Sequence, residues 1–115
     1  MPARPLDLHR IIREAISKVS GDPRFELSAA MDPDPMLVTV EEAGFSRVIE
    51  LLIENGRNAG PILIAAYSVD LRRVRIEVVG QLARVPAEIR TIIESYGGTV
   101  TTVGTTTTVE LLRSR

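Results

Sequence analysis

Phe45-Ser-Arg-Val-Ile-Glu-Leu-Leu-Ile-Glu-Asn-Gly-Arg-Asn-Ala-Gly60 is the stretch that decides the fold. Apolar residues recur in it at helical spacing, so we predict a helix over residues 41–59. Before it, Thr39-Val-Glu-Glu42 has the pattern of a capping box, in which the first and last side chains bond the free amides of a helix start. Gly60 and Pro61 are typical of a helix end.

Two residues interrupt the apolar stripe of this helix. The stripe consists of Phe45, Val48, Ile49, Leu52 and Ala59. Asn55 and Gly56 stand where apolar residues are expected, and a polar side chain facing the core needs a partner or a cavity. Asn55 is therefore either a ligand-binding residue or a buried amide bonded to a backbone carbonyl. Gly56 lets either a ligand or the neighbouring sheet approach the helix closely.

Composition narrows the class of protein. The chain has 115 residues, 44% of them hydrophobic and 25% charged, as expected for one globular domain spanning residues 1–115. A net charge of −1 gives no reason to expect nucleic acid or a membrane surface as a partner. With no cysteine and one histidine, disulfides and multi-histidine metal sites are excluded. Neither a signal peptide nor a membrane-spanning run is visible, so we expect a cytoplasmic location.

The remaining elements follow outward from the central helix. Asp7 is expected to cap a first helix that ends near Val19, and Pro86 to start a third that ends at Gly97-Gly98. The expected strands cover residues 24–30, 36–40, 62–69, 74–78, 99–103 and 105–112, with a hairpin turn at 70–72. This order favours a two-layer α/β sandwich, in which a mixed, mostly antiparallel sheet carries three helices on one face.

Nearly the whole chain resembles the catalytic ATP-binding domain of sensor histidine kinases, which has the Bergerat-type or GHKL ATPase fold. Leu6-Asp-Leu-His-Arg-Ile-Ile-Arg-Glu-Ala-Ile is similar to the opening helix of that family. Phe25-Glu-Leu-Ser-Ala-Ala-Met-Asp-Pro-Asp-Pro resembles its next strand and turn, and Phe45 to Gly60 its asparagine-box helix. Ile89-Arg-Thr-Ile-Ile-Glu-Ser-Tyr-Gly-Gly-Thr-Val resembles the last helix and the strand after it.

The resemblance implies a set of site residues. Asn55 matches the family asparagine that helps to hold the magnesium ion of Mg-ATP, whereas Leu51 stands at the earlier polar position of the box. The family's nucleotide pocket would fall on Asn55, Gly56, Asn58 and Gly80, which we interpret as a vestigial site.

The segment after residues 74–78 departs from the family pattern. Gly80 stands where an aspartate would bond the adenine amino group, and Leu82 and Arg84 replace turn glycines. The family's flexible lid is missing, because Val85 runs straight into Pro86 and the third helix. Without glycine amides to cradle phosphate, or a lid to exclude water, phosphoryl transfer is not expected.

We therefore expect a degenerate, non-catalytic kinase-like module that needs no cofactor. It would contact a response regulator or a histidine kinase in bacterial two-component or phosphorelay signalling. The surface left open by the missing lid, at Leu82, Val85 and Ile89, is the expected docking site, with these side chains unusually exposed. One alternative is a compact or truncated catalytic domain that still binds Mg-ATP through Asn55. Another is a structural domain that forms a homodimer through a strand edge at residues 105–112.

Three further groups of residues each have two interpretations. His9 is either a solvated helix residue or a phosphorylation site, and the first is favoured. Asp32 and Asp34 alternate with prolines, which favours turn formation over metal binding. Arg72, Arg73 and Arg75 form either a solvated hairpin face or a docking site for phosphate or an acidic partner, and the solvated face is favoured.

Overall fold

The computed structural model describes residues 4–19, 27–31, 36–56, 61–80 and 84–114. Its elements, in chain order, are β1 (Arg4–Asp7), α1 (Leu8–Val19), β2 (Leu27–Met31), β3 (Leu37–Val40), α2 (Glu42–Gly56), β4 (Ile62–Ser68), β5 (Arg73–Val79), α3 (Ala87–Ser95), β6 (Thr99–Val103) and β7 (Thr106–Leu112). Five strands form one sheet in the order β2-β4-β5-β7-β6, and β1 pairs with β3 in a separate two-stranded sheet.

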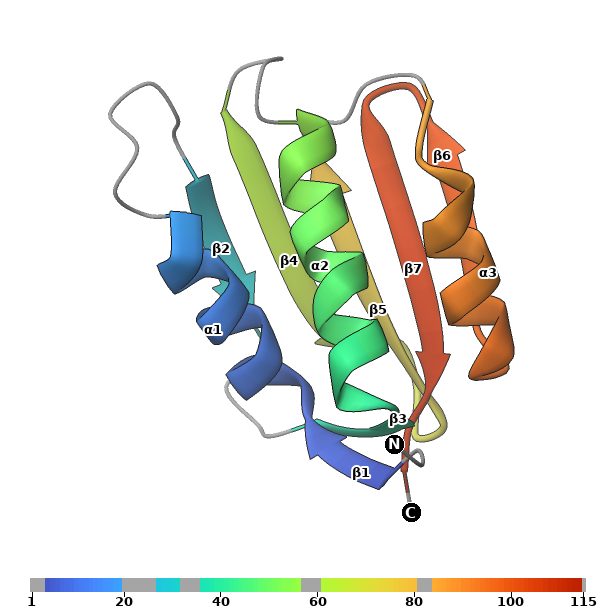
Figure 1. The fold of residues 1–115 in the computed structure, drawn as a ribbon. Coiled ribbons are helices and arrows are strands. Elements are labelled where there is room, and N and C mark those ends of the chain that lie inside the picture. Colours follow the sequence, from blue (N-terminus) through green and yellow to red (C-terminus); the bar gives the residue numbers. More distant parts are fainter. Residues whose placement is uncertain (1–3, 20–26, 32–35, 57–60, 81–83, 115) are drawn as a thin grey trace.

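The helices and the large sheet form two layers. Figure 1 shows α1, α2 and α3 side by side on one face of the five-stranded sheet. Within that sheet β2 and β4 are parallel, whereas the other neighbouring strands are antiparallel. The predicted mixed sheet with helices on one face is thereby confirmed. The pattern did not reveal that residues 36–40 leave this sheet and pair with the N-terminal segment.

The core lies between these two layers. Phe45, Val48, Ile49 and Leu52 of α2 are buried, which confirms the predicted stripe. In β5, Val74, Ile76 and Val78 are buried, and the residues between them face outward, as expected. β4 is not buried on both faces, because Ile62, Ile64 and Ala66 are buried and Leu63 is exposed.

The predicted start of α1 and end of α3 are both correct. The backbone N–H of His9 donates to Asp7 Oδ1 at 3.0 Å, the bond of an N-cap aspartate. At the end of α3, the N–H groups of Gly97 and Gly98 donate to the carbonyls of Glu94 and Ile93, both at 3.0 Å. With Gly97 at φ +79°, this pair forms a Schellman motif.

The capping box predicted before α2 is wrong. Thr39 belongs to β3, and its hydroxyl lies 2.6 Å from the Ser114 hydroxyl. The carboxylate of Glu42 accepts hydrogen bonds from Arg4 at 3.2 Å and Arg10 at 2.8 Å. The N–H of Phe45 donates to the Glu41 carbonyl at 2.9 Å, so the helix starts later than the Thr39 pattern requires. At its other end, the described part of α2 stops at Gly56, and the predicted turn at 57–60 lies outside the described residues.

His9 is buried, with 4% of its surface exposed, so the prediction of a solvated side chain is wrong. Its Nε2 atom has no hydrogen-bond partner among the described residues. The first turn of α1 lies next to the β1–β3 sheet, since the N–H of Leu8 donates to the Met36 carbonyl at 2.9 Å. Helical periodicity alone does not reveal this additional layer.

In the described ranges, no helix is both long and apolar enough to cross a bilayer.

We expect His9→Leu to stabilise the protein. An unsatisfied buried polar group costs about 1–3 kcal/mol, and leucine removes it while filling much of the same space. Urea unfolding should show a free energy of unfolding higher by about 1 kcal/mol. His9→Asn is the matched polar variant and should be less stable than wild type, because it adds a cavity. A lower stability for His9→Leu would show that Nε2 has a partner in solution.

Candidate functional site

The described residues of the implied nucleotide pocket meet at one end of the molecule. Asn55 and Gly56 form the last turn of α2, and Gly80 follows β5 directly. In Figure 1 the end of α2, the start of β4 and the end of β5 lie together at the top of the view. Asn58 and Leu82 lie outside the described residues.

Gly56 brings the helix against the sheet. A Cβ atom at this position would lie 2.6 Å from the carbonyl oxygen of Gly80 and 2.8 Å from Ile62 Cδ1. Real Cβ atoms do not approach other heavy atoms so closely, so only glycine fits without a shift of the backbone. Of the two interpretations of Gly56, this contact supports close packing of the helix on the sheet.

Gly80 connects three segments. Its N–H donates to the Thr105 carbonyl in the β6–β7 turn at 2.9 Å. Its φ of +100° suits glycine, and an added Cβ would lie 2.5 Å from the Pro61 carbonyl. The Gly80 N–H is already hydrogen-bonded and the Gly80 carbonyl faces Gly56, so neither backbone group of this residue is turned toward a ligand.

Asn55 is partly buried and takes part in an interaction within the chain. Leu51, at the earlier position of the box, packs against the core. On another side of the helix Glu50 accepts a hydrogen bond from Lys18 of α1 at 2.6 Å, which raises the pKa of Lys18. Within the described ranges, no cluster of three or more histidine or acidic side chains could hold a metal ion.

Helix α3 is attached to α2 along its length. The Tyr96 hydroxyl donates to the Glu41 carbonyl at 3.2 Å, and a Cβ at Gly44 would lie 2.5 Å from that hydroxyl oxygen. Burial is the main cause that raises the pKa of Tyr96. Nearer the start of α3, Arg47 Nε lies 3.4 Å from Glu88 Oε2. Helix α3 is therefore attached at both of its ends to the first half of α2.

Of the docking surface expected at the missing lid, the structure describes Val85 and Ile89. Ile89 is fully buried, because the first turn of α3 packs its apolar side into the core, so the expectation that it is exposed is wrong. Val85 is partly buried and packs against the same core.

The described residues do not fit a Mg-ATP site of the kind that the resemblance implies. No aspartate or glutamate occurs from Val78 to Ala87, so the end of β5 offers no carboxylate to an adenine amino group. Residues 80–86 join β5 to α3 directly, and the Gly80 amide is already hydrogen-bonded. Among the described residues, the Gly80 amide is therefore not free to join a phosphate cradle of the kind that glycine amides form in nucleotide sites.

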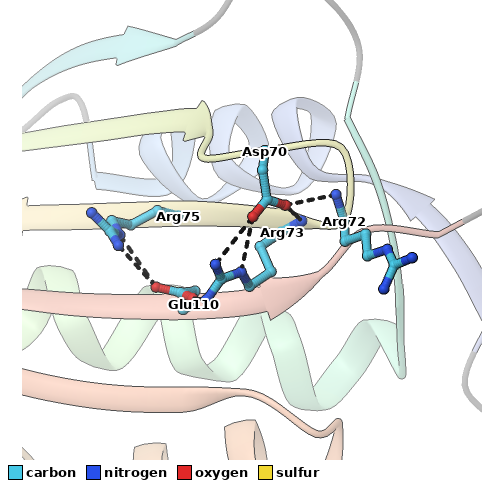
Figure 2. Close-up of polar contacts among 5 residues, drawn as sticks. All are labelled: Asp70, Arg72, Arg73, Arg75 and Glu110. Carbon is cyan, nitrogen blue, oxygen red and sulfur yellow. Dashed lines mark hydrogen bonds and ion pairs between the residues drawn. The ribbon is translucent and has the colours of Figure 1, made fainter.

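Arg73 and Arg75 of the β4–β5 hairpin lie in an ion-pair network that the sequence pattern did not resolve. Figure 2 shows Glu110 of β7 between Arg73 and Arg75, each 3.0 Å away. A hydrogen bond to Asp70 is the first cause that raises the pKa of Arg73. Beside the network, the Tyr67 hydroxyl donates to Glu77 at 2.5 Å, a contact that only strand register could have predicted.

The strand edge expected at residues 105–112 is also wrong. β7 pairs with β5 on one side and β6 on the other, so it lies inside the sheet. β6 is the terminal strand at this side.

Comparison with known proteins places this geometry in a fold. No protein-family model and no curated protein sequence matches the chain. Among solved structures, the catalytic domain of the histidine kinase ThkA aligns over 100% of both chains, with a TM-score of 0.80 and 17% identity. The ATP-binding domain of PrrB from Mycobacterium tuberculosis aligns over 98% of both chains, with a TM-score of 0.79 and 15% identity.

The chain has the fold of a histidine kinase catalytic domain. ThkA has also been solved in complex with the response regulator protein TrrA, and that structure aligns with 97% of this chain at a TM-score of 0.79 and 18% identity. At these identities the likeness establishes the fold, and the function has to be argued from the residues described above.

We expect Gly56→Ala to destabilise the protein. The added methyl group would meet the Gly80 backbone, which cannot move away as a side chain can, and such overpacking costs about 1–3 kcal/mol. Thermal unfolding should show a melting temperature lower by several degrees.

Gly44→Ala is the matched control in the same helix. Its methyl group would meet the end of the Tyr96 side chain, and the gain in helix propensity of about 1 kcal/mol offsets the disturbance. An equal loss of stability in both variants would contradict the importance of the Gly56–Gly80 contact.

Proposed function

We propose that this chain is a non-catalytic, histidine-kinase-like module that works through protein–protein contact in bacterial two-component signalling. The observation that carries the proposal is the packing of Gly80. The residue stands where the resemblance puts the adenine-binding aspartate, its amide is bonded to Thr105, and its carbonyl lies against Gly56. The backbone at this point is used for packing the fold.

The connection from β5 to α3 gives further support. Phosphoryl transfer depends on positioned phosphates and on exclusion of water, which in this fold family a lid supplies. Here residues 80–86 lead directly into α3, and Tyr96 and Glu88 tie that helix to α2. A lid at this place would require an insertion of residues between β5 and α3.

The proposed partners are a response regulator or a histidine kinase. Support comes from the shared fold and from the complex of the similar kinase ThkA with its response regulator. No cofactor is required, because the module would act by presenting a surface.

The alternative is a compact ATP-binding domain, and one observation favours it. Asn55 lies in the last turn of α2, where the resemblance puts the magnesium-holding asparagine. In that case Asn55 and bound phosphate oxygens would share the ion, which keeps several of its waters.

Calorimetric titration with magnesium and a non-hydrolysable ATP analogue separates the two functions. We expect no heat of binding and no thermal shift for the wild-type protein, because the adenine amino group would lack its carboxylate partner. A histidine kinase catalytic domain of the same fold serves as the positive control. Micromolar binding that Asn55→Ala abolishes would reject the non-catalytic module in favour of the ATP-binding domain.

A further inference from the structure

Exposed leucines gather at the end of the molecule opposite the Gly56–Gly80 contact. Leu71 in the β4–β5 turn is 91% exposed, Leu112 at the end of β7 is 56% exposed, and Leu37 in β3 is 44% exposed. In Figure 1 the β4–β5 turn, β3 and the end of β7 lie together at the bottom of the view. We call the surface formed by Leu37, Leu71 and Leu112 the leucine end.

Backbone hydrogen bonds hold these three leucines in one surface. The N–H of Arg113 donates to the Arg72 carbonyl at 2.6 Å, which ties the end of β7 to the residue after Leu71. The N–H of Ser114 donates to the Leu37 carbonyl at 2.8 Å. The segment 112–114 is therefore fixed between the β4–β5 turn and β3.

Two hollows open on either side of Leu112. The first, of about 360 Å³, is lined by Thr39, Ser95, Tyr96, Leu112 and Arg113. The second, of about 200 Å³, is lined by the Gly97-Gly98 turn, by β7 with Leu112, and by Arg73. The second is smaller than the pockets of about 300–1,000 Å³ that hold small-molecule ligands, and the first lies at the lower end of that range. Their size and their place beside an exposed leucine suit apolar side chains of a partner, the usual anchors of a protein interface.

Hydrogen bonds within the β4–β5 turn order it in the unbound protein. The Asp70 carboxylate accepts the backbone N–H groups of Arg72 and Arg73 at 2.8 and 2.9 Å, and it also accepts Nε and Nη2 of Arg73 at 3.2 and 3.1 Å (Figure 2). The first of these bonds is the main cause that lowers the pKa of Asp70. Because the turn is already ordered, Leu71 is presented with little further loss of conformational entropy on binding.

Two side chains at the leucine end, Arg72 and Arg113, carry positive charges that form no ion pair with a described residue. Asp70 and Glu110 are occupied by Arg73 and Arg75. The guanidinium of Arg72 points away from this network in Figure 2, and it forms no ion pair with any described residue. The Arg113 guanidinium donates to the Ser68 hydroxyl at 3.5 Å and forms no ion pair with a described residue. A partner with carboxylates around an apolar stripe would complement this surface.

We propose that the leucine end is a docking surface for an acidic amphipathic segment of a partner protein. Apolar side chains of the segment would enter the two hollows beside Leu112 and contact Leu71, and its carboxylates would pair with Arg72 and Arg113. The inference rests on the proposed protein–protein function and moves the contact surface away from the lid connection, where Ile89 is buried.

Fluorescence anisotropy with two labelled helical peptides tests the proposal. Both carry the same leucine face, and the opposite face is glutamate in one and lysine in the other. We expect the glutamate peptide to bind the wild-type protein at least about tenfold more tightly than the lysine peptide. Leu112→Ser, Leu71→Ser and Arg72→Glu should each weaken binding of the glutamate peptide by about tenfold, as loss of an interface anchor or a paired charge does.

Matched control variants lie at the other end of the molecule. Val103→Ser removes another exposed apolar side chain and Arg84→Glu reverses another exposed arginine, and neither should change the affinity. Equal binding of the two peptides, or equal losses in the control variants, would overturn the proposal. Self-association of the wild-type protein that Leu112→Ser removes, without peptide binding, would also overturn it and identify a second copy as the occupant.

Receiver domains of response regulators distinguish failure of this inference from failure of the proposed function. If a receiver domain binds wild type, Leu71→Ser and Leu112→Ser equally well, the leucine end is rejected while the protein–protein function stands. If the glutamate peptide binds through Leu112 and the ATP analogue binds through Asn55, the leucine end is supported while the non-catalytic function is rejected.

Discussion

The contact between Gly56 and the Gly80 carbonyl is the constraint on which the arrangement of the layers depends. Helix α2 crosses the middle of the molecule, and this contact sets how closely its last turn approaches the sheet. The Gly80 N–H donates a hydrogen bond to the Thr105 carbonyl, which fixes the end of β5 to the β6–β7 turn. The route into α3 starts from this fixed point, and α3 then packs directly on α2.

The two ends of the molecule consequently differ in what they can bind. At the end where relatives of this fold are expected to hold a nucleotide, backbone packs against backbone and no carboxylate follows β5. At the other end, strand termini and a rigid turn leave apolar side chains and two hollows exposed. The close backbone contact and the exposed apolar side chains thus lie at opposite ends of the molecule.

Features with a local cause could be predicted from the sequence. The stripe of Phe45, Val48, Ile49 and Leu52, the Asp7 cap and the Gly97-Gly98 ending all follow from rules that act within one or two turns of chain. The stretches that resemble the histidine kinase ATP-binding domain indicated its fold, and the structural comparison confirmed that fold.

Features that depend on distant parts of the chain could not be predicted. The sequence from Thr39 to Glu42 fits a helix capping box, but pairing of β3 with β1 places Thr39 in a strand. Distant parts of the fold bury His9 and Ile89, and no local sequence pattern predicts this burial. The sequence pattern predicts β7 as an edge strand, but in the sheet β6 is the edge and β7 lies between β5 and β6. For the candidate site, sequence identified Gly56 and Gly80 as unusual but could not show that they touch each other.

The position of β7 also has a consequence for how the chain folds. This strand is the last in the sequence, and it lies between β5 and β6 in the sheet. During synthesis β5 therefore keeps an unpaired edge until residues 106–112 leave the ribosome, and β6 has no strand to join. Open edges of this kind attract other chains. The sheet closes in one late step that joins segments distant in sequence, such as Arg73 with Leu112, so folding should be slow relative to helical proteins of this size.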